Sequence, residues 1–157
     1  LYYFGGYCGH DVCYHNSITQ LDTVSLQWRE CEPTNATRPV MKRGYGGMVS
    51  FKHNGVPHLL MIGGTGSKPV VQQPHNKYIK LDNGRWRTNE HSIYNISSRK
   101  WSNPSIVGQC ILPAYGFTME KINNTRAVLF GGVKTYDDAK SIVTNNIYLL
   151  EISKSTV

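Results

Sequence analysis

The chain has 157 residues, a formal net charge of +7 at pH 7 and no apolar run approaching the roughly 20 residues of a membrane-spanning helix. This length is typical of one domain with a sizeable core. The basic residues are dispersed rather than grouped, which argues against a nucleic-acid partner, and no feature predicts association with a membrane. Frequent glycine and tyrosine, without a long apolar series at helical spacing, predict an all-β chain of short strands and tight turns.

Three strands are predicted in the first part of the chain. LYYF at residues 1–4 is followed by two glycines and then by a polar, turn-rich span. An apolar segment at 18–26 then leads to WREC at 28–31, whose alternation is that of a strand. Residues 32–39 contain two prolines and predict a loop.

Four strands are predicted in the middle of the chain. Residues 43–47 lead into MVSF, an Asn-Gly hairpin signal and HLLMIGG, which ends at Gly64. A long polar excursion at 65–90, with a short alternating piece at 78–81, comes next. The third strand is HSIYNI at 91–96, and WSNPS at 101–105 starts the fourth.

The last part of the chain repeats the first half of the middle unit. YGFTMEKINNTRAVLFGG at 115–132 predicts a hairpin that again ends in two glycines. A loop at 133–144 then leads into a strand within NNIYLLEIS at 145–153. We therefore expect about ten strands in groups of three, four and three.

One pattern occurs three times along these strands. Four largely apolar residues are closed by two glycines at 1–6, 59–64 and 127–132. Such a run predicts a strand buried on both faces. The glycine pair supplies positive φ or a close backbone approach that no Cβ would permit. Recurrence of the pattern predicts a repeat architecture, in which each unit buries its faces against its neighbours.

These features resemble the kelch repeat, whose blades are four-stranded antiparallel sheets arranged radially in a β-propeller. An R-x-Y/G pattern at 43–46, partly echoed at 114–117, resembles the first strand of the family. The resemblance rests above all on the glycine pairs, on a third-strand tyrosine and on a following tryptophan: Gly5, Gly6, Gly63, Gly64, Gly131, Gly132, Tyr94, Tyr148, Trp28 and Trp101. It implies an all-β fold, a kelch-type β-propeller fragment, with the aromatic residues packed between blades.

The resemblance covers residues 1–157 as one kelch-repeat region. It divides into a partial blade at 1–36, a complete blade with a long insertion at 37–109 and a partial blade at 110–157. Because two and a half blades would leave exposed edges and an open channel, we expect the native chain to continue at both ends. The remaining blades of that longer chain would then pack against this region.

The cysteines and sequons point to different compartments. Four cysteines are too few and too scattered to predict a disulfide scaffold, which favours a reducing, cytoplasmic setting. No secretory signal opens the sequence. A secretory compartment stays open as the alternative because three N-x-S/T sequons are present, at Asn35, Asn95 and Asn123.

A cluster of metal-ligating residue types lies in the loop after the first glycine pair. Cys8, His10, Cys13 and His15 could together close a tetrahedral zinc site, but their spacing is not that of a zinc knuckle, and we expect neither metal nor cofactor. Paired acids at catalytic spacing and a nucleophile elbow are both missing from the sequence, which predicts a protein that is not an enzyme. A galactose-oxidase-like or other metal-dependent propeller enzyme is the alternative.

The resemblance implies a protein-protein interaction module that recognises a protein or peptide through loops on one face. In some members of the family this face is the substrate receptor of a ubiquitin ligase. Loops on a rigid scaffold commonly carry recognition, and Arg and Tyr there would anchor an acidic or C-terminal peptide segment. The residues expected on this face are His10, Asp11, Tyr14, His15, Arg43, Tyr45, Lys68, Gln73, Tyr136 and Asp137.

Overall fold

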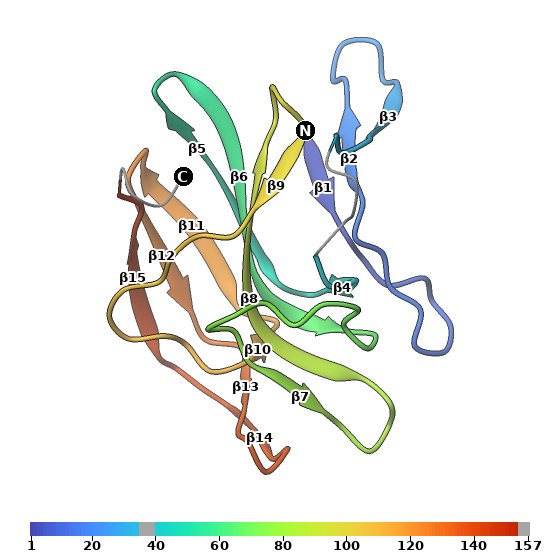
Figure 1. The fold of residues 1–157 in the computed structure, drawn as a ribbon, viewed down its shortest axis with the longest axis vertical. Coiled ribbons are helices and arrows are strands. Elements are labelled where there is room, and N and C mark those ends of the chain that lie inside the picture. Colours follow the sequence, from blue (N-terminus) through green and yellow to red (C-terminus); the bar gives the residue numbers. More distant parts are fainter. Residues whose placement is uncertain (35–39, 154–157) are drawn as a thin grey trace.

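The computed structural model describes residues 1–34 and 40–153, and these form an all-β protein with fifteen strands in four antiparallel sheets (Figure 1). Asn35 and part of the predicted loop at 32–39 lie outside the described residues. Within the described ranges, no helix is long and apolar enough to cross a membrane. The predicted all-β class is therefore confirmed, and none of the sheets closes on itself.

The first sheet holds β1 (Tyr2–Phe4), β2 (Ile18–Leu21) and β3 (Trp28–Cys31), paired in that order. The predicted apolar strand at 18–26 is shorter than expected because the chain turns after Leu21. There the carboxylate of Asp22 accepts hydrogen bonds from the backbone amides of Val24 and Ser25, at 2.9 and 3.0 Å. An Asp that caps its own turn in this way competes with continuation of the strand.

The middle sheet is built on two long strands, β6 (Val56–Gly66) and β8 (Trp86–Asn95), which pair with each other. Toward one end they are flanked by β5 (Gly47–His53) and β9 (Lys100–Ser102), which gives the meander β5-β6-β8-β9. Toward the other end they are flanked by β4 (Arg43–Gly44) and β7 (Tyr78–Lys80). The predicted excursion at 65–90 is therefore partly strand, since it contains β7 and the first half of β8.

The last part of the chain forms two small sheets. One contains β11 (Thr118–Asn123), β12 (Arg126–Phe130) and β15 (Ile147–Glu151) in that order, and we call it the third sheet. The other contains β10 (Ala114–Tyr115), β13 (Val133–Thr135) and β14 (Ser141–Val143). The sequence predicted a loop at 133–144, where β13 and β14 are found. These extra pairings explain why fifteen strands are observed where about ten were expected.

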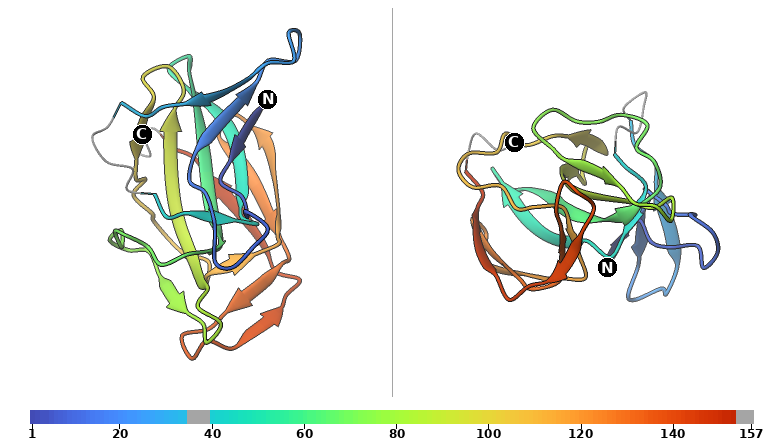
Figure 2. Two further views of the ribbon diagram at one scale, coloured as in Figure 1. Left: turned by 90° about the vertical axis from the view of Figure 1, so that its right-hand side faces the viewer. Right: turned by 90° about the horizontal axis from the view of Figure 1, so that it is seen from below.

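The middle sheet stands between the first and third sheets (Figures 1 and 2). On β6 the side chains alternate: Leu59 and Met61 join the core shared with the first sheet, whereas Leu60 and Ile62 join the core shared with the third. The strand is thus buried on both faces, as the apolar run before the glycines predicted. On β8, Ile93 and Tyr94 divide between the two cores in the same way.

The first and middle sheets place their tryptophans at the same register position. Trp101 pairs with Tyr94 across β8 and β9, and Trp28 pairs with Leu21 across β2 and β3. Trp101 is 6% exposed because the first sheet covers it, whereas Trp28 is 59% exposed and contacts only the ring of Tyr3 among the aromatic residues described. No described sheet covers the face of Trp28, so its packing between repeats stays a prediction.

The two third-strand tyrosines are not equivalent in register, contrary to the sequence comparison. Tyr94 pairs with Leu59, four residues before Gly63, whereas Tyr148 pairs with Leu129, two residues before Gly131. Leu150 occupies the register position of Tyr94 in the third sheet, since it pairs with Ala127. Spacing along the sequence misplaced Tyr148 because the segments between the second and third strands differ in length.

The first two glycine pairs lie where one sheet meets the backbone that enters the next. All six glycines of the three pairs have positive φ. A Cβ on Gly63 would stand 2.9 Å from the carbonyl oxygen of Ala114, and one on Gly64 would stand 2.6 Å from that of Gly44. Both glycines are therefore required by backbone conformation and by contact with neighbouring backbone.

We predict that Gly64→Ala destabilises the protein more than Gly108→Ala. Both residues have positive φ, at +117° and +89°, but a Cβ on Gly108 would meet nothing within 4 Å. The Gly108 variant should lose about 1–3 kcal/mol through backbone strain alone. The Gly64 variant should lose clearly more, because the new Cβ also displaces the Gly44 backbone. Urea denaturation of both variants measures the difference, and equal midpoints would contradict this assignment.

Candidate functional site

A cleft of about 320 Å³ is lined by the loop after β1, by the residue that follows β4, by β6, by the start of β8 with the segment before it, and by β10. We call it the tyrosine cleft. Its walls come from all three repeats, and they carry four tyrosines and two arginines. The lining residues are Tyr7, Tyr14, Tyr45, Thr65, Asn83, Arg85, Arg87 and Tyr115.

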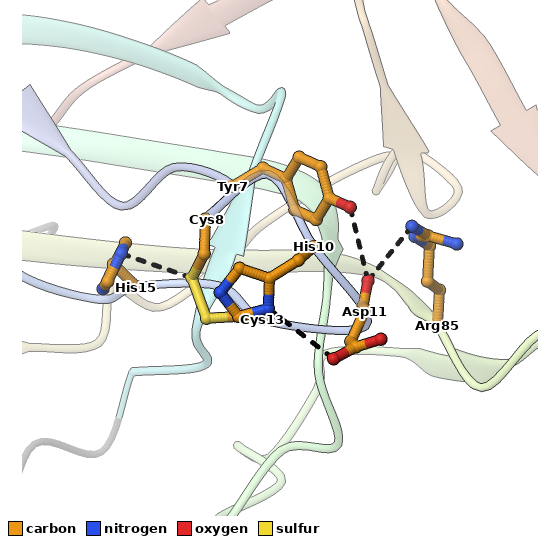
Figure 3. The surroundings of a disulfide bond; sticks show 7 residues. All are labelled: Tyr7, Cys8, His10, Asp11, Cys13, His15 and Arg85. Atoms are coloured by element: carbon orange, nitrogen blue, oxygen red, sulfur yellow. Dashed lines mark hydrogen bonds and ion pairs between the residues drawn. A yellow bond between two sulfur atoms is a disulfide. The ribbon is translucent and has the colours of Figure 1, made fainter.

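One wall is the loop at 6–15, which a disulfide between Cys8 and Cys13 closes (Figure 3). The amide of Cys8 donates to the carbonyl of Cys13 at 3.0 Å, and the rings of Tyr7 and Tyr14 contact each other at 5.2 Å between centroids. The sequence placed both cysteines in a reducing setting and weighed them as zinc ligands. In the structure they bond to each other, and the disulfide fixes the strand-like pairing of Tyr7 with Tyr14.

Arg85 joins this loop to the middle repeat. Its Nη2 donates to the carbonyl of Asp11 at 3.3 Å (Figure 3). Its Nε donates to the hydroxyl of Tyr14 at 3.1 Å, and its guanidinium lies 5.8 Å from the centre of the Tyr7 ring. The hydrogen bond with Tyr14 raises the pKa of Arg85 above its usual value. Arg85 therefore acts as a strut between the disulfide loop and the segment that enters β8.

Arg87 lies two residues further along the chain, in β8, and is only 8% exposed. Its Nη1 donates to the hydroxyl of Thr65, and its guanidinium stacks 4.3 Å from the centre of the Tyr115 ring. Its Nε is shielded from solvent and has no hydrogen-bond partner among the residues that the structure describes. Burial lowers the pKa of Arg87 below its usual value, and the charge of Arg85 acts in the same direction.

Arg43 is not a loop-face residue, contrary to the prediction from its sequence position. It is 1% exposed and forms an ion pair with Glu90, which is fully buried. The oxygens of Glu90 also accept hydrogen bonds from the amide of Met41 at 3.1 Å and from the hydroxyl of Tyr78 at 2.5 Å. This network, with the Arg43 guanidinium 5.2 Å from the centre of the Phe4 ring, joins the first repeat to the middle one.

Tyr78 closes the Glu90 network from the side of β7. Its hydroxyl accepts a hydrogen bond from the amide of Gln73 at 3.1 Å while it donates to Glu90. Burial raises the pKa of Tyr78, and the charge of Glu90 raises it further. Gln73 is itself buried, and its side-chain oxygen accepts a hydrogen bond from Asn103 at 2.7 Å. Gln73 is thus a structural residue rather than an exposed binding residue.

The other predicted binding residues are scattered. Tyr14 and Tyr45 line the tyrosine cleft, although Tyr14 is largely buried there. The remaining ones are solvent-exposed and do not line it. His10 pairs with Asp11 at 3.6 Å, His15 Nε2 lies 3.3 Å from Cys8 Sγ, and Asp137 pairs with Lys77 at 3.4 Å. Lys68 and Tyr136 complete that exposed group.

The prediction missed Tyr7, Arg85, Arg87 and Tyr115. The two arginines flank Trp86 in the sequence RWR, and residues two apart in a strand share a face. That alternation was a usable signal, but residues 65–90 were interpreted as a polar excursion. Tyr115 lies in the segment 114–117 that echoes 43–46, and this echo was its only signal, because the packing of β10 against the middle sheet is what brings it to Arg87.

Within residues 1–34 and 40–153, no three His, Cys, Asp or Glu side chains are grouped so that they could hold a metal ion. Comparison with known proteins gave no assignment either: no family model matches the chain, and no curated protein matches its sequence. The candidate site is therefore defined by its geometry alone.

We predict that Glu90→Gln destabilises the protein by about 3–5 kcal/mol, because it leaves the buried Arg43 without its counter-charge. The matched control is Asp137→Asn, which removes the exposed ion pair with Lys77 and should leave the unfolding midpoint almost unchanged. Urea denaturation compares the two. A Glu90 variant as stable as the Asp137 variant would show that the network does not hold the repeats together.

We also predict that replacing Cys8 and Cys13 together by serine loosens the loop at 6–15. A disulfide that closes a loop this short stabilises the folded loop by about 2 kcal/mol. Its removal should therefore accelerate amide exchange in the loop roughly 30-fold. The amides to follow are those of Cys8 and of His15, which donates to Gly6 O at 3.0 Å. The internal control is the amide of Gly131, which donates to the carbonyl of Asn146; both residues lie in the last part of the chain, away from the loop at 6–15. Unchanged exchange at Cys8 and His15 would contradict the role given to the disulfide.

Proposed function

We propose that the chain is part of a kelch-type β-propeller whose tyrosine cleft binds a protein or peptide. The observation that carries this proposal is the origin of the cleft. Its lining comes from the loop after the first glycine pair, from the segments at 45, 65 and 83–87 of the middle repeat, and from Tyr115 of the last repeat. A site shared by three repeats at one end is typical of recognition by a propeller.

The register relations support the repeat interpretation. In each repeat, alternate side chains of the strand before the glycine pair face opposite sides of the sheet. Tyr2 and Phe4 of β1 pack toward the middle sheet, just as Leu60 and Ile62 of β6 pack toward the third. Trp28 occupies in the first sheet the register position that Trp101 occupies in the middle sheet. One packing rule therefore describes successive sheets, as it does for successive blades.

The outer faces of the first and third sheets support the same interpretation. Tyr3 and Trp28 are exposed on the first, and Phe130, Ile147 and Leu149 are exposed on the third. These are the faces that would meet a preceding and a following blade. Contiguous exposed apolar side chains are typical of surfaces that are covered in the complete assembly, and further propeller blades are the partners we propose for them.

The chemistry of the cleft suits a peptide. Tyrosine offers a large apolar ring with a polar tip and loses little side-chain entropy on binding, and Tyr and Arg are the residue types most enriched at binding hot spots. The cleft is lined by four tyrosines and two arginines. A substrate receptor of a ubiquitin ligase is one role in which such a module would serve.

We predict that Tyr45→Ala weakens peptide binding at least about tenfold without lowering stability, because this side chain lines the cleft but is 60% exposed. Ligands would be selected on the wild-type protein from a display library of random peptides, and their affinities measured by calorimetry. Tyr3→Ala is the control, since Tyr3 is also exposed but lies on the outer face of the first sheet. Selected peptides that bind the Tyr45 variant as tightly as the wild type would place the site elsewhere.

A further inference from the structure

Arg87 is a buried cation without a buried anion. Within the described residues no carboxylate forms an ion pair with it, and its contacts are the hydroxyl of Thr65 and the face of Tyr115. Arg43, the other buried arginine, is neutralised by Glu90. Burying an unpaired charge is strongly unfavourable, so the position of Arg87 is costly for the fold by itself.

The free part of the Arg87 guanidinium has a defined shape. Nη1 is bonded to Thr65, whereas Nε has no partner. The Nε–H is one arm of the side-on edge through which arginine holds both oxygens of a carboxylate. In Arg85, by contrast, Nε and Nη2 already donate to Tyr14 and Asp11. Arg87 therefore lines the cleft with one donor that no described residue engages, and Arg85, whose Nε and Nη2 are already bonded, lines the cleft beside it.

We propose that Arg87 receives a carboxylate of the peptide bound in the tyrosine cleft. This inference rests on the proposed function and names the chemical group of the peptide that the cleft recognises. One guanidinium without a counter-charge among the described residues matches the single charge of a carboxylate better than the larger charge of a phosphate. Arg85 adds positive potential while it holds the disulfide loop in place, and the low exposure of Arg87 strengthens an ion pair formed there.

The test uses two matched pairs of short peptides as probes. N-acetyl-Phe-Ala-Ala is compared as free acid and as amide, and N-acetyl-Phe-Asp-Ala-amide is compared with its Asn counterpart. The first pair tests a C-terminal carboxylate and the second a side-chain carboxylate. In at least one pair, the carboxylate peptide should bind at least about tenfold tighter than its neutral match and should shift the Nε–H resonance of Arg87.

Two variants locate the effect. Arg87→Gln should abolish the preference for the carboxylate, with a melting temperature that is unchanged or higher because an uncompensated charge is removed. A purely structural role for Arg87 would instead lower the melting temperature. Lys121→Gln makes the same change of charge on the exposed part of β11 and should keep the preference.

The outcomes separate this inference from the function on which it rests. If charged and neutral peptides bind equally and Tyr45→Ala weakens all of them, the carboxylate assignment fails while the binding cleft stands. If the preference persists in Arg87→Gln, another cation is responsible and the assignment also fails. If no probe binds at millimolar concentration, the proposed peptide site fails together with it.

Discussion

The rest of the structure depends on the close approach of backbone to backbone at the glycine pairs. A Cβ on Gly5 would stand 2.1 Å from the carbonyl oxygen of Arg43, and one on Gly63 would stand 2.9 Å from that of Ala114. The amide of Gly6 also donates to the carbonyl of Arg43 at 3.0 Å. At both junctions the strand end of one repeat thus touches the chain that enters the next, and this contact sets the distance between adjacent sheets.

That contact also builds the candidate site. The entering segments continue past the glycines to Tyr45 and Tyr115, which both line the cleft, and the amide of Gly116 donates to the carbonyl of Tyr45 at 2.7 Å. The loop after the first glycine pair supplies Tyr7 and Tyr14 to the same place. Cleft residues that are far apart in the sequence therefore meet where the glycine pairs bring the chain segments together.

Sequence patterns were sufficient for features that depend on local periodicity and insufficient for those that depend on packing. The apolar run before Gly63 predicted a strand buried on both faces, and Leu59 to Ile62 show that alternation. Arg43 looked like an exposed loop cation because Glu90, its partner, lies 47 residues away. Arg87 lay in a stretch too polar to suggest a strand, and only the pairing of β6 with β8 places it beside Thr65. Register, rather than composition, decided which polar residues are buried.

The two buried arginines show how one side chain serves opposite purposes in the same sheet. Each lies against an aromatic ring, Arg43 near Phe4 and Arg87 near Tyr115. Arg43 meets a carboxylate of its own chain, so its charge is neutralised and its hydrogen bonds join two repeats. Arg87 meets only a hydroxyl, and one of its donors is left unused. Pairing or replacing such a cation would be more favourable for stability, so its presence at the wall of a cleft is consistent with the proposed counter-charge from a ligand.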